Sequence, residues 1–378
     1  MNKGRICFIT AVPGSANAFL KDHITALHKD YQIYYVSSEP DETKIQVEYD
    51  GYHCVGIQRG IKIGKDIKAL IALTKYFRKE KFNSVHSVTP KAGLLTAIAG
   101  FFAGIPIRIH IFTGQVWANK KGPFRWLLKF MDKMIVLFGN HFLVDGEGQR
   151  QYLIQQGILK EKNSQVLGHG SICGVNLNRF NPTEQARKEA RDEVKAGNKI
   201  VFVFMGRLNH DKGLYELLPA FNRLASERDD VFLLLFGNDE ENIASHFPEY
   251  KHMNDNNYLY YGRTSEPQKM LQAGDVFVLP TYREGFGSSV IEASALGLPV
   301  ICSDAYGVRD AMVDGLTGLR CKVGDVESLY EAMKRFAESP ELINKMGKAG
   351  MERVVKDFDG KKMTENWVNL YHQLVPIK

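Results

Sequence analysis

Residues 206–213 (GRLNHDKG) place two cations in one short loop between an apolar run and a helical pattern. Arg207 follows the run 199–205, and Lys212 stands at the start of the helix expected over 213–226. The N–H groups and positive dipole end of a helix start attract anions; arginine binds a diphosphate bidentately and lysine adds a point charge. The loop therefore predicts a diphosphate site, with a solvated loop of chance basic residues as the alternative. Its spacing is not that of a Walker A loop, which disfavours phosphoryl transfer.

Residues 280–293 (PTYREGFGSSVIEA) add two carboxylates around a glycine-rich turn. Glu284 precedes the turn, and Glu292 falls about one turn into a helix expected to begin near Ser288. A carboxylate accepts paired hydrogen bonds from vicinal hydroxyls, as on a ribose. Either glutamate could instead be a surface acid. The stretch ASALGLPV after Glu292 has a buried character, however, and an unpaired buried charge is costly, which favours ligand binding.

A weaker signal lies at residues 11–16 (AVPGSA), directly after the first expected strand. Gly14 would let the backbone approach a ligand closely, and the following helix would offer free N–H groups. A plain strand-to-helix turn explains the same residues equally well.

These loops need a scaffold that brings strand ends together. Short β-branched runs alternate with helical patterns, which predicts parallel sheets in two successive Rossmann-like halves. Strands are expected at 5–10, 32–36, 84–88, 108–112 and 141–144, and again at 199–205, 231–236, 258–261, 276–279 and 300–303. Helices are expected at 18–29, 67–80, 92–102, 213–226, 288–296 and 326–339, and the polar stretch 181–198 as a connection. In such sheets ligands bind beyond the carboxyl ends of the strands.

Bulk properties agree with an ordinary soluble two-domain protein. The chain has 378 residues, 44% hydrophobic and 24% charged, and five scattered cysteines that favour neither disulfides nor zinc, so a reducing cytosol is expected. The uncharged stretch 92–107 is too short to span a bilayer and predicts a buried helix. Residues 1–180 carry 24 Lys and Arg against 13 Asp and Glu, whereas the remainder carries 25 against 30. The basic first half suggests an anionic partner.

The second half resembles a known family over long stretches. Glu284 and Glu292 have the E-x7-E spacing of the retaining GT-B glycosyltransferases of family 4, and residues 284–318 are similar to that family's donor-site signature throughout. Residues 206–213 match its G-R-x4-K-G, the similarity extends over 260–285, and GHGSICGVNLNRF at 168–180 is similar to its interdomain connector. The resemblance implies an α/β GT-B fold of two Rossmann-like domains with parallel sheets facing a central cleft. We expect residues 1–183 to bind acceptor, 184–355 to bind a nucleotide sugar, and a helix in 356–378 to return to the first domain.

The resemblance also implies roles for individual residues. Arg207 and Lys212 would bind the donor diphosphate, Glu292 the ribose, and Arg263 with Thr264 would lie near the base, which is expected to be uracil. Gly14 would let the loop at residues 11–16 approach the diphosphate and the acceptor. The donor sugar would be held by Glu284, Gly285, Phe286, Gly287 and Ser288. The expected catalytic residues are Glu284, Arg207, Lys212 and His110. No cofactor or metal is expected, because the only D-x-D match, at 357–359, lies in the tail.

The first half departs from the family's pattern. Thr113 occupies the position of a histidine found in many members, and His110 lies three residues earlier. His110 either replaces that histidine or is a strand histidine with a structural hydrogen bond, and we favour the second interpretation. A front-face reaction needs no protein base, because the leaving phosphate can take the acceptor's proton; a covalent intermediate on Glu284 is the alternative.

Residues 117–134 interleave aromatics with cations, a pattern suited to an anionic membrane surface, with an amphipathic core helix and a solvated basic face as the alternative. With the resemblance, this favours a lipid-linked acceptor, a polyprenyl diphosphate sugar of surface-polysaccharide assembly, at the inner face of the cytoplasmic membrane. Nucleic acid is not expected, because no binding module is present. A nucleotide-sugar 2-epimerase and a non-catalytic sugar-binding or assembly protein are the alternative functions.

Overall fold

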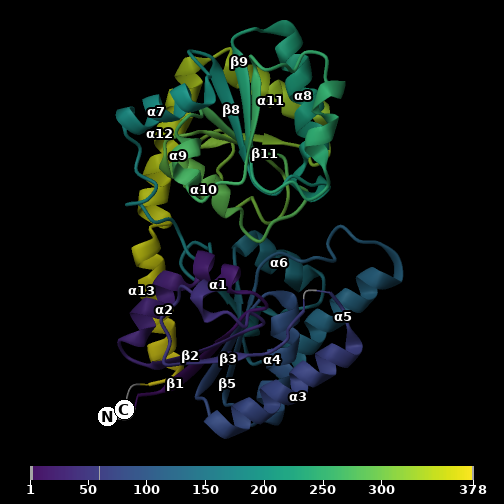
Figure 1. The fold of residues 1–378 in the computed structure, drawn as a ribbon, viewed down its shortest axis with the longest axis vertical. Coiled ribbons are helices and arrows are strands. Elements are labelled where there is room, and N and C mark those ends of the chain that lie inside the picture. The colour runs from purple at the N-terminus through teal and green to yellow at the C-terminus, as the bar shows by residue number, and fades with distance from the viewer. Residues whose placement is uncertain (1–2, 59, 377–378) are drawn as a thin grey trace. The chain divides into compact units, whose positions relative to one another are not determined.

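The computed structural model describes residues 3–58 and 60–376, which form two compact units (Figure 1). The N-terminal unit contains the described residues up to Cys173 together with those from Lys361 onward, and the C-terminal unit is Gly174–Gly360. The division lies at 173/174 rather than at 183/184. Val175 forms a parallel bridge with Asp359, and Thr183 N donates to Gln272 Oε1 at 3.0 Å, so the connecting stretch packs on the C-terminal unit.

The N-terminal unit is built on a seven-stranded parallel sheet of order β3-β2-β1-β4-β5-β6-β7. The strands are β1 (Arg5–Ile9), β2 (Gln32–Ser37), β3 (Gly51–Cys54), β4 (Ser84–Val88), β5 (Ile107–Phe112), β6 (His141–Val144) and β7 (Ser164–Val166). The helices are α1 (Pro13–Phe19), α2 (Lys21–His28), α3 (Ile63–Glu80), α4 (Pro90–Phe102), α5 (Gly122–Phe138), α6 (Glu147–Gln155) and α13 (Gly360–Leu374). The helix expected over 18–29 is the shorter α2, and the stretch 11–16, expected as a loop, enters the separate helix α1 at Pro13.

Residues of the central strand β1 enter two separate hydrophobic clusters, because successive strand residues point to opposite faces of the sheet. Ile6 and Phe8 pack in one cluster with residues of α2 and α13, and Cys7 and Ile9 pack in another with residues of α3 and α4. Helices α2 and α13 therefore cover one face of the sheet, and α3 and α4 the other (Figure 1).

The C-terminal unit has a six-stranded parallel sheet of order β10-β9-β8-β11-β12-β13. The strands are β8 (Ile200–Met205), β9 (Val231–Phe236), β10 (Tyr258–Gly262), β11 (Val276–Leu279), β12 (Val300–Ser303) and β13 (Gly318–Cys321). The helices are α7 (Glu184–Val194), α8 (Leu214–Glu227), α9 (Pro267–Leu271), α10 (Ser288–Ala295), α11 (Val326–Ala337) and α12 (Pro340–Asp357).

The stretch 181–198, expected as a polar connection, contains helix α7. The Thr183 side chain caps this helix by accepting from Ala186 N, and Ala190 and Val194 provide a narrow buried stripe that its many charged residues obscure in the sequence. The expected buried helix after residue 92 is α4. Within the described parts of the chain, no helix combines the length and the apolar character that crossing a bilayer requires.

Candidate functional site

The loop 206–213, which carries Arg207 and Lys212, and the segment 280–293, which carries Glu284 and Glu292, lie against each other at the carboxyl edge of the second sheet. The loop after β8 forms a short 3-10 turn, His210–Lys212, which is capped by the Asn209 side chain accepting from Lys212 N at 3.2 Å. Gly213 follows with φ +76°, and a Cβ there would lie 2.0 Å from the carbonyl oxygen of Pro280. Only glycine permits this approach, so the sequence fixes Lys212 beside the segment that carries Glu284.

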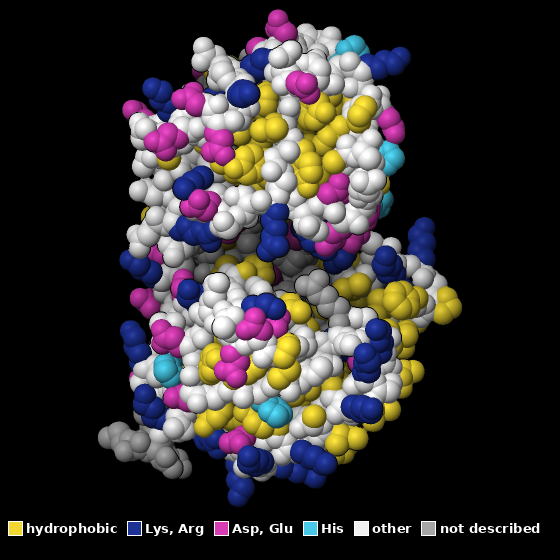
Figure 2. Space-filling view, in the orientation of Figure 1, with side chains coloured by type: hydrophobic (Ala, Val, Ile, Leu, Met, Phe, Trp, Pro, Cys, Tyr) yellow, Lys and Arg dark blue, Asp and Glu magenta, His cyan; other side chains and the backbone are white. Residues whose placement is uncertain are grey.

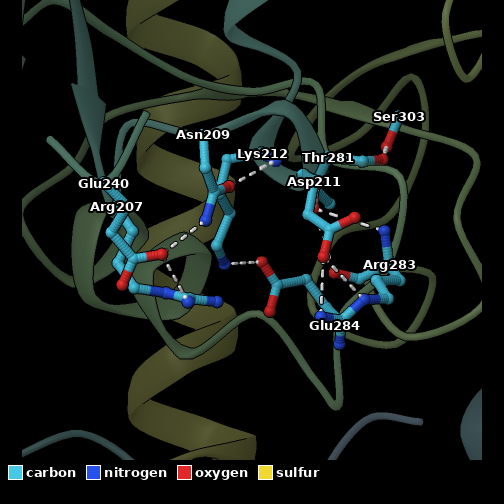
Figure 3. Close-up of polar contacts among 9 residues, drawn as sticks. All are labelled: Arg207, Asn209, Asp211, Lys212, Glu240, Thr281, Arg283, Glu284 and Ser303. Atoms are coloured by element: carbon cyan, nitrogen blue, oxygen red, sulfur yellow. Dashed lines mark hydrogen bonds and ion pairs between the residues drawn. The ribbon is translucent and has the colours of Figure 1, made fainter. Parts of the chain in front are cut away.

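Each of the two cations is paired with a carboxylate (Figure 3). Lys212 Nζ forms an ion pair with Glu284 Oε1, and both side chains are largely buried. Arg207 is half exposed, and its Nη1 lies 2.9 Å from Glu240 Oε2, which also accepts from Asn209 Nδ2 at 2.9 Å. The site therefore holds two positive groups whose charges are balanced by protein carboxylates.

A second set of contacts fixes the backbone around these pairs (Figure 3). Asp211 Oδ2 accepts from Arg283 Nε at 3.0 Å and from Nη2 at 2.7 Å, and Thr281 Oγ1 donates to the Asp211 carbonyl at 2.9 Å. The Ser303 hydroxyl, at the end of β12, donates to the Thr281 carbonyl. Loops that follow β8, β11 and β12 are thereby tied together.

Three residues of the site, Glu240, Asp211 and Arg283, have no role that the sequence predicts. Glu240 follows β9, which neighbours β8 in the sheet. A carboxylate just after a strand expected to lie beside β8 is the one sequence feature that could have indicated a partner for Arg207. Asp211 lies in the segment 206–213 and Arg283 in the segment 280–293, but only their mutual contact shows that they hold these two segments together.

Helix α10 begins at the glycine-rich turn and carries the second glutamate. Its N-cap, Gly287, has φ +87°, and a Cβ there would lie 2.7 Å from the Val308 side chain. Burial raises the pKa of Glu292 to about 7, against the opposing charge of Arg179. Among residues 3–58 and 60–376, no group forms a hydrogen bond or ion pair with the Glu292 carboxyl. A partly accessible carboxyl that no described protein group hydrogen-bonds is suited to accept hydrogen bonds from a ligand.

The other predicted donor-site residues of this unit lie at the same edge of the sheet. Arg263 is exposed just after β10, and Thr264 Oγ1 accepts from Glu266 N at 3.0 Å. Gly285 and Gly287 lie between Glu284 and α10, and Ser288 is the first residue of that helix. Phe286 is buried and packs edge-on against Phe358, with ring centres 5.3 Å apart. Phe286 therefore anchors the turn by its side chain, and only its backbone could meet a ligand.

The two candidates of the N-terminal unit differ in accessibility. Gly14 is exposed on α1, and no heavy atom lies within 4 Å of where its Cβ would be, so its surroundings are open. His110 is buried in β5, its Nδ1 lies 2.9 Å from Ser87 Oγ, and a Cβ on Gly93 would lie 2.3 Å from its ring. Burial lowers the pKa of His110 to about 3. This geometry favours the structural interpretation of His110 over a role as a base.

The basic segment 117–134 is arranged differently from the basic amphipathic face that its sequence suggests. Trp117 precedes α5 and is buried, with Nε1 donating to Asp132 Oδ2 at 2.6 Å. Arg125 and Lys129 lie over the Trp117 ring and donate to Gln156 Oε1 at 3.2 and 3.0 Å. Lys129 Nζ also lies 5.8 Å from the centre of the exposed Trp126 ring, so these two partly buried cations contact aromatic rings and an amide of the unit.

In the described ranges no three histidine, cysteine, aspartate or glutamate side chains gather as a metal site. The five cysteines are free, three of them buried.

Comparisons with known proteins agree with one another. Residues 185–353 match the family described as glycosyl transferases group 1. The chain is 31% identical over 345 residues to the capsular polysaccharide biosynthesis glycosyltransferase CapM of Staphylococcus aureus, covering 91% of this chain and 90% of that protein. It is 25% identical over 327 residues to an Escherichia coli UDP-Gal:alpha-D-GlcNAc-diphosphoundecaprenol alpha-1,3-galactosyltransferase, covering 84% and 82%.

Solved structures share the fold. Anabaena Alr3699/HepE, crystallised in complex with UDP and glucose, superposes with a TM-score of 0.82 at 16% identity, covering 98% of this chain and 100% of that one. Sucrose-phosphate synthase from Thermosynechococcus elongatus superposes with a TM-score of 0.80 at 19% identity, covering 98% and 99%. These likenesses confirm the predicted fold class, two Rossmann-like α/β domains of the GT-B type.

Proposed function

Because the chain belongs to the group 1 glycosyltransferases, we propose that it transfers a sugar, with retention, from a UDP-linked donor to a glycan carried on a polyprenyl diphosphate. The observation that carries the proposal is the pair of cations at the carboxyl edge of the second sheet, Arg207 and Lys212, together with the unpartnered carboxyl of Glu292 on α10. Two positive groups suit a diphosphate, and a carboxylate suits ribose hydroxyls. The nucleotide in the Anabaena structure and the substrate named for the Escherichia coli relative support the choice of UDP.

The same residues supply the chemistry of transfer. The donor diphosphate would replace Glu240 on Arg207 and Glu284 on Lys212, which leaves both cations facing the oxygens that gain negative charge as the sugar departs. Glu284, released from Lys212, would then accept hydrogen bonds from the sugar hydroxyls. The C–O bond between sugar and diphosphate breaks, the acceptor oxygen bonds to the same face of the sugar, and the leaving phosphate takes the acceptor's proton. This route uses no metal and does not require His110 as a base.

The acceptor proposal also sets the location. A polyprenyl diphosphate glycan is membrane-bound, so we propose that the protein acts as a peripheral protein of polysaccharide assembly at the inner face of the cytoplasmic membrane. The role named for the Staphylococcus aureus relative, capsular polysaccharide biosynthesis, supports this choice.

A panel of nucleotide sugars tests the proposed function. A UDP-sugar is expected to raise the melting temperature in proportion to the logarithm of its concentration, because a ligand that binds only the folded state stabilises it by mass action. Transfer to a polyprenyl diphosphate glycan should then release UDP only when that acceptor is present. Stabilisation by no UDP-sugar would contradict the donor, and conversion of the UDP-sugar without acceptor would indicate an epimerase.

The raised pKa of Glu292 predicts a pH-dependent donor affinity. Ribose hydroxyls donate to the ionised carboxyl, which is the minor form below pH 7. Affinity for UDP-glucose, used as a probe, should rise about tenfold between pH 6 and pH 8, since one pKa unit corresponds to tenfold in ionisation. Isothermal titration at three pH values measures it. Glu292→Gln is the matched control, because it should bind weakly with a flat pH profile; an unchanged profile in this variant would show that another group titrates.

A further inference from the structure

The N-terminal unit exposes large apolar side chains on three helices, α3, α4 and α5. Ile63, Ile67 and Ile71 follow one another at intervals of four along α3, and Ile63 is 72% exposed. Phe102 ends α4, and Trp126 (69% exposed) and Phe130 lie on α5. Soluble proteins seldom expose apolar side chains in such groups unless the surface binds something.

These side chains belong to one surface of the unit, hereafter the α3–α5 face. Helix α4 packs against both α3 and α5. On α3, Ala69, Leu73 and Phe77 form the buried stripe, so the isoleucines lie on a different side of the helix from the core. Figure 2 shows apolar side chains interspersed with Lys and Arg along the edge of this unit where Figure 1 draws α3 and α5.

The charges around the α3–α5 face have one sign. Lys62, Lys65, Lys68 and Lys133 are exposed on or beside these helices. The acids of the same helices are engaged elsewhere: Asp66 pairs with the buried Lys91, Glu80 pairs with Arg5, and Asp132 is buried against Trp117. Interleaved lysines and large apolar side chains fit the headgroup boundary of an anionic bilayer, where the cations attract the lipid headgroups and the apolar side chains enter the acyl region.

We propose that the α3–α5 face inserts its apolar side chains into an anionic membrane leaflet. The inference rests on the proposed function, because that function places the acceptor in this membrane. It refines the expectation for segment 117–134. Arg125 and Lys129 lie over the Trp117 ring, and Lys129 Nζ also lies 5.8 Å from the centre of the Trp126 ring. The exposed side chains of Trp126 and Phe130, with the isoleucines of α3, therefore make the contact. The lysines then hold the rim of the inserted patch at the headgroups.

Co-sedimentation with vesicles of equal parts phosphatidylglycerol and phosphatidylcholine tests the proposal. Trp126→Glu and Ile67→Glu should each weaken binding about tenfold or more. Each variant loses a large apolar side chain that would enter the membrane, and it adds a negative charge that the anionic lipids repel. Val355→Glu, at an apolar position on α12 that is 50% exposed against 52% for Ile67, is the matched control and should bind as the parent does. Vesicles of phosphatidylcholine alone should bind the parent protein weakly.

Two results would overturn this proposal. The first is that both variants sediment with vesicles as the parent does. The second is that the parent is a dimer which Trp126→Glu dissociates, while neither the parent nor the variant binds vesicles. The second result would make the α3–α5 face an interface between copies of the chain. UDP binding by the variants, followed by thermal shift, separates this outcome from the proposed function. If Trp126→Glu keeps UDP binding but loses vesicles, both proposals stand. If the parent binds vesicles but no UDP-sugar, the proposed function fails and the membrane face is retained.

Discussion

Replacing Lys212 by methionine is expected to lower kcat/KM for sugar transfer by about 100- to 1000-fold, the usual effect of removing one group that stabilises transition-state charge. Methionine keeps the stem of the side chain but removes the charge that Glu284 now balances. In the donor-bound state Lys212 would have exchanged Glu284 for the diphosphate, so the variant loses one positive charge beside the leaving group. Steady-state transfer with a UDP-sugar and a lipid-linked acceptor measures the effect. A kcat/KM equal to that of the parent protein would show that Lys212 takes no part in the transfer step.

Glu240→Gln is the opposing control for this charge argument. If Glu240 only balances Arg207 in the empty site, its neutralisation should tighten UDP binding by about two- to fivefold, the size of a partly exposed ion pair. Glu241→Gln changes the same charge one residue later, but its carboxylate accepts from His210 N, so UDP affinity should not change. Weaker UDP binding in Glu240→Gln would show instead that Glu240 positions Arg207 for the diphosphate.

The sequence could predict those parts of the site that a short segment carries by itself. The strand, loop and helix around Arg207 and Lys212, and the turn between Glu284 and α10, are local patterns of residue type and spacing. The partner of Arg207 could not be predicted this way, because Glu240 reaches it from a neighbouring strand. For the same reason Asp211 and Arg283 gained a role only from their contact.

The α5 segment shows a second limit of sequence patterns. Spacing correctly indicates an amphipathic helix, but it cannot say that Arg125 and Lys129 stack on a tryptophan that precedes the helix. Nor can it say that the carboxyl of Asp132 is buried, where it accepts from Trp117 Nε1 and where burial raises its pKa to about 7. Tertiary contacts decide which side of such a helix meets solvent.

The contact of α13 with the N-terminal sheet rests on two buried histidines. The Trp367 ring stacks between His23, at 4.8 Å, and His86, at 5.0 Å. His23 Nδ1 lies 2.9 Å from Thr364 Oγ1, and His86 Nδ1 lies 2.8 Å from the hydroxyl of Tyr371. His86 Nε2 is buried and has no hydrogen-bond partner in the described chain. A proton on that nitrogen would have no acceptor, so the packing requires the neutral ring.

Acid should therefore destabilise the N-terminal unit well above the pH at which carboxylates titrate. Burial lowers the pKa to about 4 for His23 and to about 3 for His86 and His110. As the pH falls below 6.5, the histidines of the unfolded chain bind protons while those of the folded unit stay neutral. The free energy of unfolding is therefore at its full value above pH 6.5 and decreases as the pH falls toward 4. Asp132 has a raised pKa, so the folded unit binds a proton there that the unfolded chain does not bind. This offsets the effect of about one of the three histidines on the free energy of unfolding.

The net of about two protons gives a loss of roughly 3 kcal/mol per pH unit, which within two units approaches the whole stability of a typical domain. Urea unfolding from pH 7.5 to 4.5, followed by tryptophan fluorescence, measures the slope. His86→Phe keeps the stack on Trp367 and should reduce the slope by about 1.4 kcal/mol per pH unit. His252→Gln, at an exposed position of the C-terminal unit, should leave it unchanged. A constant free energy of unfolding between pH 6.5 and 4.5 would mean that the histidines become protonated within the folded unit, and that α13 is held by apolar packing alone.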